Sequence, residues 1–281
     1  MPATTLVTVD ELAAHLTDPG WCVFDCRHDL ADPGKGERAY RESHIPGARF
    51  AHLDRDLSGA RTGRNGRHPL PDPAAFAQWL GQAGVGNAAQ IIAYDDAGGA
   101  FAARLWWLSR WLGHESVALL DGGWSAWLAA GGPTTDVAPA VTPTRFEGHP
   151  DPSMTVDAAW VEAHLDTTAF RLIDARSPDR YRGENETIDP VAGHIPGAAN
   201  RFFRDNLLAD GRFASPDALR AAFAAIAAGM PPTAIVHQCG SGVTACHNLL
   251  AMEIAGLPGA RLYPGSWSEW CSDPRRPVVK G

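Results

Sequence analysis

The chain repeats itself, and this constrains its fold more than any other feature of the sequence. Three short motifs of the first half return in the second half, in the same order and at a nearly constant offset. Val23–Arg27 recurs as Leu172–Arg176, His44–Ala48 as His194–Ala198, and Gly123–Trp127 as Ser266–Trp270. Self-similarity of this kind indicates a duplicated structural unit. We infer that two copies of one domain are joined head to tail.

Each copy alternates short apolar runs with amphipathic segments, which predicts strands and helices in turn. The expected strands are Trp21–Phe24, Ile91–Tyr94 and Val117–Leu120, then Phe170–Ile173, Ala234–His237 and Arg261–Tyr263. The expected helices are Pro73–Ala83, Phe101–Leu112, Pro216–Ala228 and Thr244–Ala255. This alternation predicts the α/β class, with a mostly parallel sheet flanked by helices in each domain. Ligands of such folds bind beyond the carboxyl ends of the strands.

Prolines, which interrupt helices and central strands, gather between the two copies. We predict a first domain over residues 1–135, a Pro-rich linker over 136–152 and a second domain over 153–281. Thr8 and Thr155 are expected to cap the helix that opens each domain.

Composition and charge disfavour several classes of partner. The chain has 281 residues, a net charge of −8 and five cysteines. The negative balance argues against nucleic acid or an anionic membrane as the main partner. No apolar segment approaches the length of a membrane span, and no signal peptide pattern is visible at the N-terminus. The cysteine count does not suggest a disulfide framework, so we expect a cytoplasmic protein.

A cysteine just after the expected strand 234–237 is the leading candidate for a nucleophile. Cys239 is followed by Gly240-Ser241-Gly242, and a helix is expected to begin near Val243. The glycines let the loop curl so that backbone N–H groups converge on the sulfur, and the helix adds its positive N-terminal end. Both effects stabilise an anion, so we expect Cys239 to react as a thiolate that accepts and passes on an atom.

The first copy lacks this nucleophile. When Ile91–Asp95 is aligned with Ile235–Cys239, Asp95 takes the place of the cysteine. Because a carboxylate cannot do the work of a thiolate, only the second copy is expected to be catalytic.

Two other enzyme classes with anion-binding loops are disfavoured. A cysteine phosphatase needs an arginine six residues after the cysteine, where this chain has Ala245. A nucleotide-binding P-loop ends in Gly-Lys-Ser/Thr, and this loop contains no lysine. A non-catalytic sulfur-carrier module would retain the cysteine and stays open as an alternative.

These features together resemble the tandem-domain rhodanese family of sulfurtransferases. The resemblance covers essentially the whole chain and rests on the Asp-x-Arg and His-Ile-Pro-Gly-Ala motifs of both halves, the Cys239 loop and the closing segment Gly265–Trp270. It implies two rhodanese-like domains and a loop cysteine that takes a sulfane sulfur from a small-molecule donor as a persulfide. It also implies a thiol or cyanide acceptor, with a thioredoxin-like protein as one candidate, and neither a metal nor an organic cofactor.

The loop after the cysteine separates two kinds of donor within this family. Enzymes that prefer thiosulfate typically carry Arg and Lys there, whereas those that prefer 3-mercaptopyruvate carry the sequence found here at Gly240, Ser241, Gly242, Val243 and Thr244. The resemblance therefore implies that this loop binds 3-mercaptopyruvate, with thiosulfate as the alternative donor. The leaving group is then the enolate of pyruvate, whose protonation a neutral hydroxyl can assist.

Four further site residues enter through the resemblance. In 3-mercaptopyruvate enzymes the loop serine works with a His and an Asp of the first domain, and the best matches here are His68 and Asp54. Two arginines nine residues apart usually hold the substrate carboxylate in that group of enzymes. Arg180 matches the first of them, but Asp189 stands at the second position and Arg182 is the nearby substitute.

Each assignment also has a structural alternative. In the structural interpretation, Ser241 is a helix cap without a catalytic role, and His68 is an exposed residue of a turn. Arg180 and Arg182 can form surface ion pairs with Asp179 and Glu184.

Overall fold

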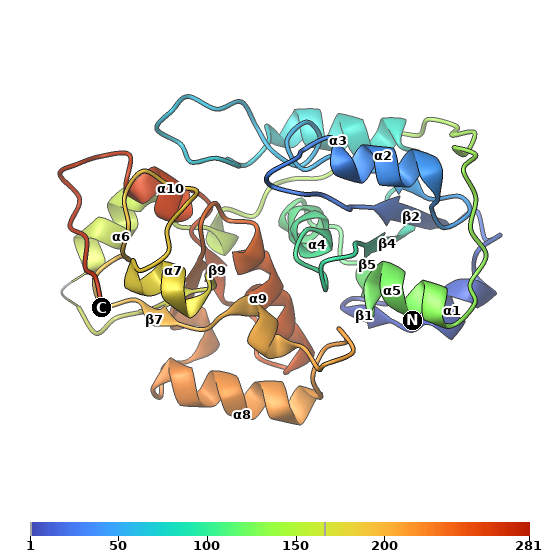
Figure 1. Ribbon diagram of the computed structural model, residues 1–281. Coiled ribbons are helices and arrows are strands. Elements are labelled where there is room, and N and C mark those ends of the chain that lie inside the picture. Colours follow the sequence, from blue (N-terminus) through green and yellow to red (C-terminus); the bar gives the residue numbers. More distant parts are fainter. Residues whose placement is uncertain (1, 166) are drawn as a thin grey trace. The chain divides into compact units, whose positions relative to one another are not determined.

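The chain folds into two compact units, which are described separately below. The computed structural model describes residues 2–165 and 167–281. Unit 1 comprises residues 1–59, 71–151 and 209–213, and unit 2 comprises residues 60–70, 152–208 and 214–281. Each unit contains one sheet with helices on both sides (Figure 1). Both units are therefore discontinuous in sequence.

The sheet of unit 1 has five strands in the order β1-β5-β4-β2-β3, and every pairing between them is parallel. The strands are β1 (Leu6–Val7), β2 (Trp21–Asp25), β3 (Arg49–Phe50), β4 (Gln90–Tyr94) and β5 (Val117–Leu120). Its helices are α1 (Val9–Ala14), α2 (Lys35–Glu42), α3 (Pro73–Gln82), α4 (Ala102–Trp111) and α5 (Gly123–Ala129). Leu12 of α1 and Trp127 of α5 join one core cluster with Val23 and Ile92 of the sheet. Since side chains alternate along a strand, Phe24 points to the opposite face and meets Trp79 of α3.

The sheet of unit 2 has four strands in the order β7-β6-β8-β9, again all parallel. The strands are β6 (Arg171–Asp174), β7 (Ala199–Asn200), β8 (Ile235–Gln238) and β9 (Arg261–Leu262). The α-helices are α6 (Ala158–His164), α7 (Pro178–Arg182), α8 (Pro216–Ala227), α9 (Thr244–Ile254) and α10 (Ser266–Trp270), and the 3-10 turns are η1 (Pro152–Met154), η2 (Phe203–Asn206) and η3 (Pro232–Ala234). Val161 of α6 and Trp267 of α10 pack on one face of this sheet. On the other face, Phe223 of α8 contacts His237 of β8.

The repeated Asp-x-Arg and Trp motifs build the same local structure in both units. Arg27 forms a buried ion pair with Asp25, and its guanidinium lies 4.6 Å from the ring centroid of Trp124. Arg176 pairs with Asp174 in the same way and lies 4.8 Å from the ring centroid of Trp267. Pairing and hydrogen bonding offset the cost of burying these charges. The recurrence of these residues in sequence is therefore explained by a recurring ion pair beneath an indole ring.

The repeated His-Ile-Pro-Gly-Ala motif is likewise structural. The ring of His44 stacks on Tyr40, and the ring of His194 stacks on Tyr181. The Nδ1 atom of each histidine hydrogen-bonds the main-chain oxygen of the tyrosine on which it stacks, at 2.6 and 2.9 Å respectively. Both histidines are buried and held in the same way.

The predicted fold class is confirmed, and the expected strands and helices agree with the observed bounds to within about two residues. The Thr8 cap is also confirmed, since its side chain accepts from the Glu11 amide in a capping box. The Thr155 cap is wrong. Asp157 caps α6 instead, by accepting from the Trp160 amide, because the helix begins two residues later than its counterpart. In the described part of the chain, no helix is long and apolar enough to cross a membrane.

Two segments, residues 136–151 of the predicted linker and residues 60–70, each belong to one of the two units. Much of the predicted linker lies on unit 1, where Phe146 is buried and the amide of Asp151 donates to the Trp111 carbonyl at 2.8 Å. Residues 60–70, which come early in the chain, belong instead to unit 2. Their position matters for the candidate site because they include His68.

Stability is expected to fall in mild acid because of one buried histidine. Burial and the nearby Arg201 charge lower the pKa of His237 to about 3. An unfolded chain takes up the proton near pH 6.5, so stability from this residue is present above that pH and declines as the pH falls toward 3. Between pH 7 and pH 5 the loss amounts to about 2 kcal/mol. Urea unfolding at both pH values measures it, and His237→Gln is expected to abolish this contribution. An unchanged pH dependence in the variant would contradict the assignment.

Candidate functional site

The strand–loop–helix arrangement predicted around Cys239 is present. Strand β8 ends at Gln238 and α9 begins at Thr244, so Cys239 lies at the carboxyl end of a central strand. The thiol is almost completely buried, and its Sγ accepts from the amide of Gly242 at 3.2 Å. The amide of Cys239 itself donates to the Ser266 hydroxyl at 3.1 Å. The sulfur therefore sits inside its own loop, in contact with a backbone donor.

Glycine at position 242 is required by both backbone conformation and space. Gly242 has a φ of 77°, in the left-handed region that favours glycine. A Cβ atom there would also lie 2.4 Å from the carbonyl oxygen of Pro264, which is too close for any side chain. This residue lets the chain turn sharply enough for its amide to reach the sulfur.

Unit 1 fills the equivalent loop with a carboxylate. The Asp95 side chain accepts four backbone N–H bonds, each 2.8 Å long, from Ala97, Gly99, Phe101 and Ala102. Burial raises the pKa of the Asp95 carboxyl, and these four hydrogen bonds oppose that rise. The loop architecture shared by the two copies is thus able to surround a buried anion with backbone donors. In unit 1 the group that these backbone donors surround is the Asp95 carboxylate.

Ser241 and His68 lie together beside Cys239. The Ser241 hydroxyl oxygen is 2.7 Å from Nδ1 of His68, and both side chains are buried. The residue that caps α9 is Val243, which makes no side-chain cap bond. Ser241 is therefore not the cap of this helix, and His68 is not an exposed turn residue. The structure brings these two predicted site residues together.

The segment that carries His68 is fixed to unit 2 by its neighbours. The amide of Arg67 donates to the Ser268 hydroxyl at 3.0 Å. Gly66 has a φ of 83°, and a Cβ atom there would lie 2.7 Å from the carbonyl oxygen of Gly265. Close approach of the Gly66 backbone to the start of α10 thus sets the position of the histidine.

Two guanidinium groups, from Arg67 and Arg180, lie against Gly240. A Cβ atom at Gly240 would be 2.9 Å from Nη2 of Arg67 and 3.5 Å from Nη2 of Arg180. Arg180 is a predicted site residue, whereas sequence reasoning missed Arg67. Arg182, the expected substitute for a second arginine, instead pairs with the exposed Glu184 through hydrogen bonds of 2.8 and 2.7 Å.

Buried carboxylates hold the two arginines in place. Arg180 donates from Nε and Nη2 to Glu186, and its Nη2 is also 3.4 Å from Asp189. Arg67 donates from Nη1 to the other oxygen of Asp189. Burial alone would raise the pKa of Glu186, but its hydrogen bonds from Arg180 and the backbone outweigh burial and lower it. Burial raises the pKa of Asp189 even though Arg67 opposes the rise.

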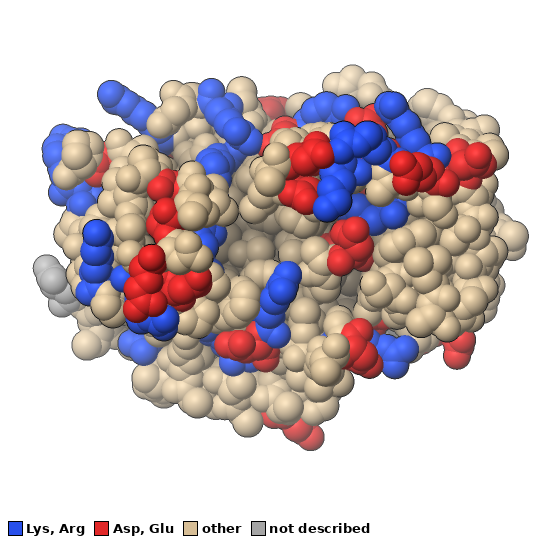
Figure 2. Space-filling view, in the orientation of Figure 1, with Lys and Arg blue, Asp and Glu red and all other residues tan. Residues whose placement is uncertain are grey.

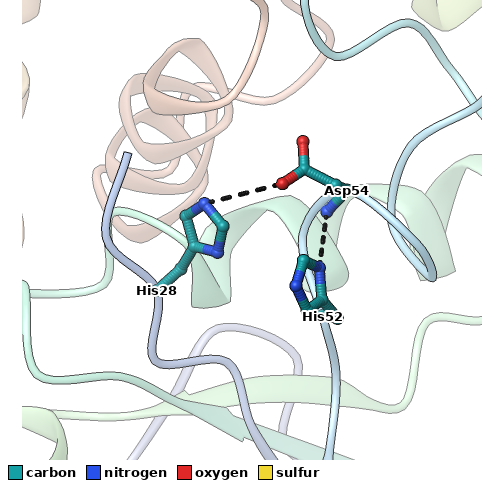
Figure 3. A group of neighbouring side chains, drawn as sticks. All are labelled: His28, His52 and Asp54. Atoms are coloured by element: carbon teal, nitrogen blue, oxygen red, sulfur yellow. Dashed lines mark hydrogen bonds and ion pairs between the residues drawn. The ribbon is translucent and has the colours of Figure 1, made fainter. Parts of the chain in front are cut away.

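Asp54 belongs to unit 1, where it lies beside two buried histidines (Figure 3). Its carboxylate is 4.0 Å from Nε2 of His28, and its amide donates to Nδ1 of His52 at 3.1 Å. The three side chains lie close enough together to suggest a metal site. However, Nδ1 of His52 already accepts from the amides of Asp54 and Arg55, so a neutral ring carries its proton on Nε2. As placed, this imidazole offers no lone pair to a metal.

Charges of both signs are mixed over the surface visible in Figure 2. Lys and Arg side chains on that face stand among Asp and Glu rather than in one broad basic field. On this face, an anionic substrate would therefore be held by local positive charge rather than by the overall field.

Comparison with known proteins tests the family prediction. The family model described as "Rhodanese-like domain" matches residues 8–130 and again residues 157–273. A "Probable 3-mercaptopyruvate sulfurtransferase" of Pseudomonas aeruginosa is 53% identical, with 100% of each chain covered. A "Putative thiosulfate sulfurtransferase" of Mycobacterium tuberculosis is 38% identical, covering 98% of this chain and 97% of the relative. The human "3-mercaptopyruvate sulfurtransferase" is also 38% identical, covering 83% of this chain and 78% of the relative.

Solved structures agree with these relatives. The crystal structure of a 3-mercaptopyruvate sulfurtransferase from Escherichia coli superposes with a TM-score of 0.80 at 32% identity, covering 94% of this chain and 99% of that one. The corresponding enzyme from Leishmania major gives a TM-score of 0.84 at 30% identity, over 96% of this chain and 75% of that one. Both rhodanese-like matches and both sheets thus agree with the predicted tandem organisation. The chain belongs to the rhodanese-like family of sulfurtransferases, as a member in which the domain occurs twice.

Proposed function

We propose that this protein is a 3-mercaptopyruvate sulfurtransferase that carries the transferred sulfur as a persulfide on Cys239. The observation that carries this proposal is the 2.7 Å contact between Ser241 Oγ and His68 Nδ1. Ser241 lies two residues after the nucleophile Cys239. A buried hydroxyl–imidazole pair is suited to moving a proton, which a 3-mercaptopyruvate donor requires. The loop residues 240–244 are all uncharged, which fits a donor whose carboxylate is remote from its sulfur.

The first half-reaction transfers sulfur to the enzyme. The Cys239 thiolate attacks the donor sulfur, an S–S bond forms, and the carbon–sulfur bond breaks with its electron pair left on carbon as the enolate of pyruvate. The proton of the donor thiol ends on the methyl carbon of pyruvate, and His68 and Ser241 carry it there. The Gly242 amide, which already contacts Sγ, stabilises negative charge on the sulfur throughout.

The second half-reaction returns the enzyme to its starting state. An acceptor thiolate or cyanide attacks the outer sulfur of the persulfide, and the Cys239 thiolate leaves. Our proposal for a protein acceptor is a thioredoxin-like dithiol, and our proposal for the compartment is the cytoplasm.

The roles of the remaining predicted residues are part of this proposal. Gly240, Gly242, Val243 and Thr244 form the loop that binds the donor, and Arg180 binds its carboxylate. We assign no role to Arg182, since its guanidinium is engaged by Glu184.

A direct comparison of donors tests the proposal. We expect kcat/KM for 3-mercaptopyruvate to exceed that for thiosulfate by about 100-fold. The Ser241–His68 pair accelerates only the reaction that needs a proton transfer, which is the reaction of 3-mercaptopyruvate. The measurement is a steady-state assay of both donors with cyanide as the common acceptor. A preference for thiosulfate would overturn the donor assignment. Formation of a persulfide without repeated turnover of either donor would instead indicate a sulfur carrier.

A further inference from the structure

The donor-binding side of the loop contains two cations, although the sequence places only one of them near the expected position. A Cβ atom at Gly240 would lie 2.9 Å from Arg67 Nη2 and 3.6 Å from Arg180 Nη1. Gly240 directly follows Cys239, so both guanidinium groups lie next to the residue that carries the nucleophile. Arg67 and Arg180 are 113 positions apart in the chain.

Hydrogen bonding leaves one end of each guanidinium available. Arg180 uses Nε and Nη2 for Glu186 and Asp189, and Arg67 uses Nη1 for Asp189. Within the described part of the chain, Arg67 Nη2 and Arg180 Nη1 make no hydrogen bond. Arg67 Nη2 is the atom of its side chain nearest to the Cβ position at Gly240, and both Nη atoms of Arg180 lie at nearly equal distances from the same point, 3.6 Å for the unbonded Nη1 and 3.5 Å for Nη2. Both side chains are about one-fifth exposed, at 22% and 18%, so a ligand can reach them.

Asp189 links the two arginines. One carboxylate oxygen accepts from Arg67 and the other is 3.4 Å from Arg180 Nη2. The Asp189 side chain is only 3% exposed, so it acts as a buried anchor between two partly exposed cations. The Asp189 carboxylate therefore holds Arg67, which comes from a distant segment of the chain, beside the Cys239 loop.

We propose that Arg67, positioned by Asp189, pairs with Arg180 to bind the carboxylate of the sulfur donor. This inference rests on the proposed function and identifies the second cation of its donor site. Two guanidinium groups suit a carboxylate, because the unbonded Nη atom of each can donate a charge-assisted hydrogen bond to one of its oxygens. Arg67 thus takes the part that the family resemblance gives to an arginine at position 189, and it does so from the segment that also carries His68.

The space at Gly240 provides a structural reason for this arrangement. Any side chain at position 240 would displace the Arg67 guanidinium, since even a Cβ atom would approach it to 2.9 Å. The absence of a side chain lets the cation lie over the loop backbone. The donor carboxylate can then be held while its sulfur reaches Cys239.

Steady-state kinetics of Arg67→Gln test the binding role. We expect KM for 3-mercaptopyruvate to rise about 10-fold or more with kcat changed less than about threefold, the size expected for loss of a charge-assisted hydrogen bond. Arg182→Gln is the matched control, since Arg182 is bonded to Glu184, and should leave KM unchanged. A KM for Arg67→Gln within twofold of the unaltered protein would overturn the proposal.

A second measurement does not depend on sulfur transfer. Iodoacetate and iodoacetamide both alkylate a thiolate through their CH2 carbon with loss of iodide, but only iodoacetate carries a carboxylate. We expect Arg67→Gln to lower the iodoacetate-to-iodoacetamide rate ratio at Cys239 by about fivefold or more, measured by peptide mass spectrometry. An unchanged ratio would overturn the proposal. If the unaltered protein failed to turn over 3-mercaptopyruvate while this ratio still fell, the proposed function would fail and the anion site would stand.

The positioning role of Asp189 requires a double-mutant cycle. Asp189→Asn should raise KM in the presence of Arg67, because the guanidinium loses its anchor. In the Arg67→Gln background the same change should raise KM less, because Arg180 is still held by its hydrogen bonds to Glu186. An equal rise in both backgrounds would show that Asp189 does not act through Arg67.

Discussion

Replacement of Cys239 by serine is expected to lower kcat for sulfur transfer by about 10⁴-fold or more while leaving the fold intact. A serine hydroxyl is almost fully protonated at neutral pH and cannot hold the transferred sulfur as a persulfide. The thiol fills a small buried space, with Sγ 3.2 Å from the Gly242 amide, and the smaller oxygen fits the same space. Loss of activity would therefore report lost chemistry rather than lost structure.

The matched control for this substitution is Cys246→Ser. Cys246 lies in α9 of the same unit, is completely buried, and donates its thiol to the Gly242 carbonyl at 3.3 Å. A serine there retains a donor and should preserve turnover to within about threefold. Circular dichroism and thermal unfolding verify that both variants fold. Sulfur transfer by Cys239→Ser near the level of the unaltered protein would exclude Cys239 as the sulfur carrier.

The fold was predictable from sequence because its signals are local. Short apolar runs such as residues 91–94, alternating with amphipathic segments, are typical of central strands in a covered parallel sheet. The duplicated Asp-x-Arg and Trp motifs recur because each unit needs the same buried ion pair beneath an indole. The misplaced cap at Thr155 is also a local matter: Asp157, two residues on, has an equally good acceptor.

The candidate site was less predictable because half of it depends on a contact between distant segments. The cysteine loop carries its own signals, namely a strand end, glycines and a helix start. Arg67 carries none, since an arginine in a Gly- and Arg-rich turn resembles a solvated residue. Its position depends on the ion pair with Asp189 and the Ser268 bond, which only the folded chain reveals. Its place immediately before His68 is the one clue that the sequence offered.

Asp189 illustrates how a departure from a family pattern is interpreted differently once the fold is known. In the sequence it stands where an arginine was expected, and it weakens the case for 3-mercaptopyruvate. In the structure its buried carboxylate contacts two arginines next to Gly240. A second guanidinium is thus supplied by another segment, and under our proposal the departure is compatible with an anionic donor.

Replacement of Ser241 by alanine is expected to separate the two possible donors. Turnover of 3-mercaptopyruvate should fall about 100-fold, the usual contribution of a positioned proton donor, because the enolate loses the hydroxyl that protonates it. Turnover of thiosulfate should fall less than about threefold, since sulfite leaves as a stable anion and needs no proton. The measurement is kcat for each donor with the same acceptor, in the variant and the unaltered protein.

The Ser241–His68 contact makes a second substitution informative. His68→Gln removes the imidazole that lies 2.7 Å from the Ser241 hydroxyl and should reproduce the donor-selective loss. If the two residues act as one relay, the double variant should be no slower than the slower single variant, because either change alone interrupts proton movement. Equal losses for both donors would mean that Ser241 supports the shape of the loop rather than the proton. A selective loss would instead assign the serine to the breaking carbon–sulfur bond, the step in which 3-mercaptopyruvate differs from thiosulfate.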